Sequence, residues 1–206
     1  MIDDLGLSLE KTGELKVLDF DVEARPLSWI TSDYVSKEIT AIGCQWIEKK
    51  GKGKSACWLL GVHDPVEMLE SFRQFYDKAD MVVGHYIRGY DLPTVMGAMT
   101  DFHLDPITSK LTHDTKQDLV KWQGHSKSQE NIGAMLGIDN PKVHMNQEMW
   151  REANRLTPEG VKLTRERVLG DVKQNIEMRA RLLELGYLGP PQVWEYSQHG
   201  YGQYKP

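Results

Sequence analysis

The sequence of 206 residues has few cysteines, no long apolar run and no basic tail. Cys44 and Cys57 are too few to build a disulfide framework, so we expect a reducing, cytoplasmic environment. No apolar run approaches the roughly 20 residues that cross a bilayer. The acidic N-terminus also lacks the basic-then-apolar pattern of a signal peptide. We therefore expect no membrane partner.

Internal repeats and low-complexity segments are also lacking, and the composition is that of a folded protein. Hydrophobic residues make up 40% and charged residues 27% of the chain, which excludes wholesale disorder and a coiled-coil rod. The formal net charge is −5, from 25 Lys and Arg against 30 Asp and Glu. A site built from carboxylates contributes to such a balance, so a nucleic-acid partner is not excluded.

Hydrophobic periodicity predicts an α/β protein in which three strands come first and strands then alternate with helices. The second and third strands are typical of a hairpin around a loop rich in glycine and lysine. We expect a mixed central sheet flanked by helices. Strands are predicted over 16–22, 38–47, 55–61, 80–84 and 111–114, and helices from Pro65, near 92–102, 115–123 and 128–136, and over 159–185.

The length favours one domain, which we place at residues 16–187. Residues 1–15 are assigned to an N-terminal extension. Residues 188–206 combine glycine and proline with several aromatic residues, and we expect an extended C-terminal arm rather than a folded unit. For its aromatic side chains, packing on the chain itself or on a partner subunit is favoured over stacking on bases.

Three acidic residues lie at alternate positions of the first predicted strand. The period of two places Asp19, Asp21 and Glu23 on one face of this strand. That face is either solvated or meets a cation, because aligned carboxylates are costly to bury alone. The apolar neighbours suggest a central strand, and hard divalent cations prefer several carboxylate oxygens. A metal site is therefore one of two interpretations of this acidic face, and a solvated face is the other.

Two further acids have similar alternatives. Asp91 follows a predicted buried strand and starts a helix, so it is either a helix cap or part of a site at the end of the strand. Asp171 lies at the edge of the apolar stripe of the long helix. It either faces solvent or reaches the same cluster of carboxylates as a further ligand.

Four segments of the chain, taken in order, resemble the motifs of one enzyme family. Residues 17–23 (Val-Leu-Asp-Phe-Asp-Val-Glu) resemble the first motif of the DEDD, or DnaQ-like, 3′–5′ exonucleases. Residues 84–93, which end in Tyr-Asp-Leu-Pro, are similar to their second motif. Residues 113–137 resemble the segment that joins the second and third motifs, and residues 170–183 resemble the third.

This resemblance implies an RNase H-like fold with Asp21, Glu23, Asp91 and Asp171 as catalytic and metal-binding carboxylates. It also implies two divalent cations, Mg²⁺ or Mn²⁺, and phosphodiester hydrolysis by a two-metal mechanism. Asp21 is expected to contact both cations. Glu23 and Asp171 would complete the site that activates water, and Asp91 would hold the other cation.

The sequence departs from the family pattern at three positions. Tyr86 stands where the second motif usually has Asn, and the Tyr or His of the third motif is replaced by Arg167 or Glu166, respectively. At about 100° per residue, Arg167 lies near the face of Asp171, whereas Glu166 points away. Both are candidates for positioning water or contacting phosphate.

The function implied is a metal-dependent 3′–5′ exonuclease that acts on a single-stranded or frayed 3′ end. We favour DNA over RNA as the substrate, in proofreading or replication-associated trimming of the phage or bacterial type, with a DNA polymerase or replisome as a partner. One alternative is a 3′–5′ exoribonuclease for RNA end processing. Another is a catalytically weakened nucleic-acid-binding or polymerase-partner module.

Overall fold

The computed structural model describes residues 15–27, 36–48, 53–121, 123–139 and 144–195. Most of the expected N-terminal extension, the tip of the hairpin loop and the end of the expected C-terminal arm lie outside these residues. Within the described part of the chain, no helix is both long and apolar enough to cross a membrane.

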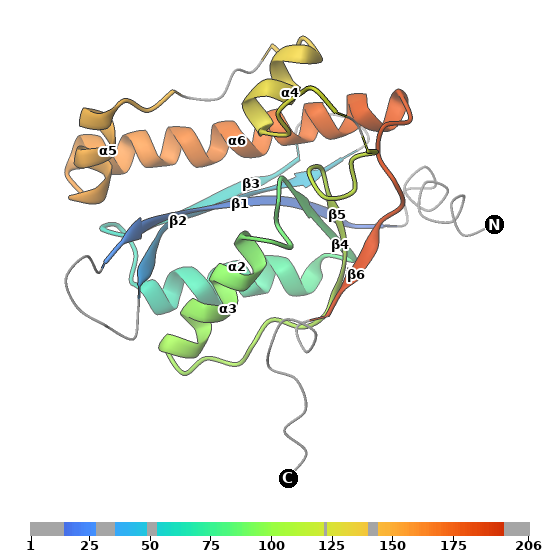
Figure 1. Cartoon of the computed structure of the whole chain (residues 1–206). Coiled ribbons are helices and arrows are strands. Elements are labelled where there is room, and N and C mark those ends of the chain that lie inside the picture. The colour runs from blue at the N-terminus through green and yellow to red at the C-terminus, as the bar shows by residue number, and fades with distance from the viewer. Residues whose placement is uncertain (1–14, 28–35, 49–52, 122, 140–143, 196–206) are drawn as a thin grey trace.

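The chain forms one mixed sheet in the order β3-β2-β1-β4-β5-β6 (Figure 1). The first three strands form an antiparallel meander, β4 and β5 continue parallel to β1, and β6 returns antiparallel to β5. This arrangement confirms the predicted hairpin followed by crossover connections. The strands are β1 (Val17–Pro26), β2 (Lys37–Ile47), β3 (Ser55–Leu59), β4 (Met81–Gly84), β5 (Lys110–Asp114) and β6 (Gln192–Trp194).

Helices cover both faces of this sheet (Figure 1). On one face lie α2 (Pro65–Lys78) and α3 (Asp91–Asp101), and on the other lies the long helix α6 (Pro158–Glu184) with α4 (Gln129–Met135) and α5 (Gln147–Asn154). Helix α2 begins at Pro65, as predicted, and the Asp64 carboxylate caps it by accepting the backbone N–H groups of Val66 and Glu67.

The main apolar core lies between the sheet and α2 and α3. Leu18, Phe20 and Val22 of β1 belong to this core, and the ring centroids of Phe20 and Phe72 are 5.0 Å apart. Because successive side chains of a strand point to opposite faces, the acidic residues of β1 point to the other face, toward α6. The alternation in this strand therefore separates an apolar layer from an acidic one.

A glycine allows α6 to lie close to the sheet beside the acidic residues. Gly43 of β2 pairs with Asp21 of β1, and a Cβ at Gly43 would lie 3.0 Å from a methyl group of Val168 in α6. The helix itself begins at a well-defined cap, where the Thr157 hydroxyl accepts the N–H of Gly160 at 3.1 Å. These contacts set the distance of α6 from the sheet and the residue at which the helix begins.

Three sequence predictions of secondary structure need correction. The helix expected near 115–123 is a turn, because the Asp114 carboxylate accepts the N–H groups of Lys116 and Gln117. Helix α5 was not predicted from the sequence. Part of the expected C-terminal arm forms β6, and the side chain of Trp194 is buried against the domain.

We predict that Gly84→Ala destabilises the protein whereas Gly97→Ala does not. A Cβ at Gly84 would lie 2.1 Å from Ile87 Cγ2 and 2.8 Å from the carbonyl oxygen of Phe20, so backbone must shift. Such overpacking costs about 1–3 kcal/mol. Gly97 lies in helix α3 with nothing within 4 Å of a new Cβ, and alanine should stabilise it by about 0.5–1 kcal/mol.

Urea unfolding of the two variants and the wild type measures both effects. Equal stability of Gly84→Ala and the wild type would contradict the close packing at the end of β4.

Candidate active site

The acidic row of β1 changes in exposure along the strand. Asp19 is fully buried, whereas Asp21 and Glu23 are only partly buried toward the carboxyl end of the strand. The three residues thus share a face, as predicted, but only Asp21 and Glu23 are partly exposed to solvent. The strand passes from a buried polar layer into an open acidic site.

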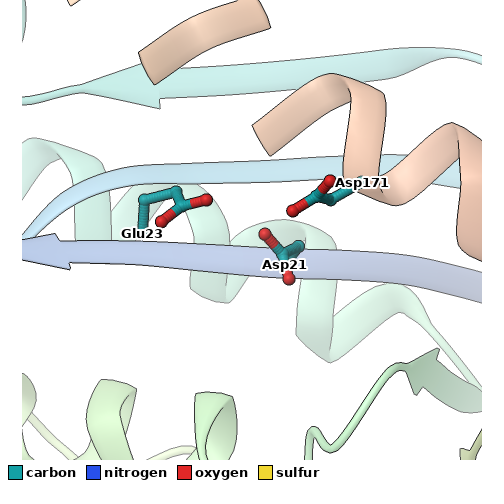
Figure 2. A group of neighbouring side chains, drawn as sticks. All are labelled: Asp21, Glu23 and Asp171. Carbon is teal, nitrogen blue, oxygen red and sulfur yellow. The ribbon is translucent and has the colours of Figure 1, made fainter. Parts of the chain in front are cut away.

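Asp171 of α6 reaches this open end of the row. Carboxylate oxygens of Asp21, Glu23 and Asp171 all lie within 4.8 Å of one another. Figure 2 shows the carboxylates pointing toward the same space between β1 and α6. Asp171 itself is 2% exposed, so the mid-helix aspartate faces the cluster rather than solvent. We call these three residues the carboxylate cluster.

Asp91, the fourth residue of the predicted quartet, lies beside the cluster but is not a member of it. Its Oδ1 accepts the backbone N–H of Val22 at 2.9 Å. This N–H is available because β1 pairs with β4 only as far as Asp19 and Val83. The side chain of Asp91 therefore accepts a hydrogen bond from β1 at a position where β4 no longer pairs with this strand.

Arg167 lies among the carboxylates. Its Nε donates to Glu23 Oε1 at 2.5 Å, and its Nη2 is 3.8 Å from Asp171 Oδ2. The guanidinium carbon is 5.0 Å from the centroid of the Trp150 ring in α5. The structure thus places Arg167 in the site, whereas Glu166 is exposed on the same helix.

A buried hydrogen-bond network lies behind the cluster, and sequence reasoning did not find it. Asn175 of α6 donates to Asp19 Oδ2 at 2.6 Å and accepts from the hydroxyl of Thr115 at 2.7 Å. Burial raises the pKa of Asp19 well above its usual value, and the hydrogen bond from Asn175 opposes this shift. The only sequence signal was Asn175 one helical turn after Asp171.

Asp114 organises the two loops at this end of the sheet. Its carboxylate accepts backbone N–H groups of Tyr86 and Arg88 after β4 and of Lys116 and Gln117 after β5. Tyr86 has a φ of 72°, which is uncommon for a residue other than glycine. The same carboxylate therefore holds the loop of the second motif in its unusual conformation.

The donor set of the cluster suits a hard divalent cation. All three side chains offer carboxylate oxygens, the ligands that Mg²⁺ and Mn²⁺ prefer. Three like charges this close together repel one another. The ion pairs of Arg167 with Glu23 and Asp171 bring one positive charge to the cluster and offset part of this repulsion.

A comparison of the sequence with protein-family models and with curated proteins finds no match. The fold, however, is similar to a solved structure of the family B DNA polymerase from the hyperthermophilic archaeon Pyrobaculum calidifontis. The TM-score is 0.60 at 16% sequence identity, and the match covers 82% of this chain and 24% of the polymerase chain. The protein has an α/β, RNase H-like fold, and the match spans about a quarter of the length of that polymerase chain.

We predict that the stabilising effect of Asp91→Asn grows as the pH rises from about 4 to about 8. The pKa of Asp91 is raised to about 8, chiefly by burial and to a smaller extent by the charges of Asp114 and Glu23, against hydrogen bonds from the backbone N–H groups of Val22 and Asp91. In the unfolded chain this pKa is about 3.9. The stability that the protonated carboxyl contributes is therefore complete below about pH 4 and is lost toward about pH 8, by at most about 1.4 kcal/mol per pH unit.

Urea unfolding in the presence of a chelator, at several pH values across this range, tests the prediction. The exposed Asp101→Asn variant serves as the control and should follow the wild-type profile. Parallel profiles for Asp91→Asn and the wild type would show that Asp91 is ionised normally in the folded protein.

Proposed function

We propose that this protein is a metal-dependent 3′–5′ exonuclease that hydrolyses phosphodiester bonds at a single-stranded or frayed DNA end. The convergence of Asp21, Glu23 and Asp171 from β1 and α6 carries this proposal. The RNase H-like frame places these side chains at the open end of a central strand, where a polynucleotide end can reach them. The likeness in fold to part of a DNA polymerase supports a setting in DNA replication, with a polymerase as the partner.

The three carboxylates of the cluster would hold the divalent cations, and Asp91 lies close enough in the fold to remain a predicted fourth ligand. When bound, such cations polarise the phosphate and lower the pKa of water. Asp21 and Glu23 present their carboxylate oxygens from β1, and Asp171 presents its oxygens from α6 on the other side of the same space. These residues define where the scissile phosphate must be placed.

Arg167 and Trp150 give the site an additional binding function. The guanidinium of Arg167 has the planar donor geometry that matches a phosphate, and it lies within the carboxylate cluster. Trp150 holds this guanidinium from the side of α5. We expect Arg167 to contact the phosphate of the 3′ end rather than to act as a base, because it does not lose its proton.

The second candidate is a nucleic-acid-binding or polymerase-partner module with weakened catalysis. The ion pair between Arg167 and Glu23 favours it, because this arginine stands where the exonuclease pattern has a tyrosine. RNA end processing is the third candidate, since no described residue distinguishes the 2′-hydroxyl. A comparison of DNA and RNA substrates in one assay distinguishes these three candidate functions.

We predict that Asp21→Asn abolishes Mg²⁺- or Mn²⁺-dependent shortening of a 5′-labelled single-stranded DNA oligonucleotide. The change removes a carboxylate from the cluster with almost no change in size, so a loss of about 10³-fold or more is expected for a group that holds the catalytic cation. Gel electrophoresis of the labelled products measures the rate and shows the direction of digestion.

Matched controls make the result specific. Asp101→Asn, an exposed acid at the end of α3, should retain wild-type activity. A circular single strand should resist digestion if an end is required, and a matched RNA oligonucleotide tests the sugar preference. Intact DNA and RNA with both metals would leave the binding module as the function to test.

A further inference from the structure

The environment of Arg167 is that of a resident cation rather than of a surface arginine. Its side chain and that of Glu23 are each only 14% exposed, and the two are in direct contact. Solvent screens such a half-buried pair less than a surface ion pair. Asp171 approaches from the same helix and the Trp150 ring from α5, so contacts from three elements hold the guanidinium.

The charges of the carboxylate cluster limit how many further cations it can bind. Asp21, Glu23 and Asp171 carry three negative charges when ionised, and Arg167 is permanently positive. One divalent cation beside Arg167 balances the cluster. Two would leave an excess of positive charge in the absence of substrate, and the like charges of Arg167 and a second cation would repel each other at short range.

The oxygen ligands limit the number in the same way. Oε1 of Glu23 accepts the hydrogen bond from Arg167. The Oδ1 atom of Asp91 accepts the N–H of Val22 and lies outside the set of oxygens that are within 4.8 Å of one another. One oxygen of Glu23 and one of Asp91 are thus engaged by donors of the chain itself, which reduces the number of oxygens that a second cation can use.

We propose that Arg167 takes the place of the second cation, so that the substrate-free protein binds one divalent cation per chain at Asp21, Glu23 and Asp171. This inference rests on the proposed metal-dependent hydrolysis and deepens it, because it changes the expected metal content of that site from two to one. Trp150 acts as a positioning residue that keeps the guanidinium over the carboxylates.

Mn²⁺ binding to the full, chelator-treated chain tests this proposal without any substrate. Titration followed by the electron paramagnetic resonance signal of free Mn²⁺ gives the number of ions bound and their Kd. We expect one ion for the wild type and two for Arg167→Gln, with the first ion bound about tenfold more tightly in the variant because a nearby positive charge is gone.

Two control variants separate charge from position. Arg165→Gln removes the same charge from an exposed site two residues earlier on α6 and should still bind one ion. Arg167→Lys keeps the positive charge and should also bind one. Circular dichroism shows whether each variant is folded. If Arg167→Gln does not fold, the number of ions bound by the wild type still tests the proposal, because two ions would contradict it.

Each other outcome has a definite meaning. Two ions in the wild type, or a single ion in Arg167→Gln at any Kd, would overturn the role of Arg167 and leave the proposed nuclease function standing. Two ions in Arg167→Lys would overturn the charge argument. Binding by neither the wild type nor Arg167→Gln at millimolar Mn²⁺ would instead overturn metal-dependent hydrolysis itself.

Discussion

Mutual repulsion among the carboxylates between β1 and α6 is the constraint on which the rest of the site depends. Asp21, Glu23 and Asp171 come within 4.8 Å of one another at a place that is only partly open to water. Such an arrangement persists only where the surrounding structure holds each side chain and supplies positive charge. Arg167 supplies part of this charge from within the chain.

The fold meets this constraint with two different kinds of contact. Apolar packing of Val168 against Gly43 sets the distance between α6 and the sheet. Gly43 has no side chain, so the helix can come close to the strand at this position. Polar contacts set the rotation and register of the helix: Asn175 joins Asp19 to Thr115, and Arg179 contacts the imidazole of His113. Hydrogen bonds suit this task because they are directional. The buried network is thus the support of the open site.

Much of the fold followed from local patterns. The alternation in β1, the Asp-Pro start of α2 and the long helix of α6 were predicted within a few residues, because periodicity and capping act over short distances. The turn after β5 was wrongly predicted as a helix, because the side chain of Asp114 competes for the backbone N–H groups that a helix would use. The pairing of β6 with β5 joins residues about 80 positions apart, beyond the reach of any local pattern.

Three features of the site can be read from the residues and the fixed periods of the backbone: the charged positions, the acidic face of β1, and the helix face that Asp171 and Arg167 share. Which acids meet depends instead on tertiary packing. It buried Asp19 beneath Asn175, gathered three carboxylates around Arg167, and turned Asp91 toward the N–H of Val22. Asp21 and Asp171 are about 150 residues apart in the chain, and their strand and helix approach at a distance set by packing across the whole sheet, which no local sequence pattern encodes.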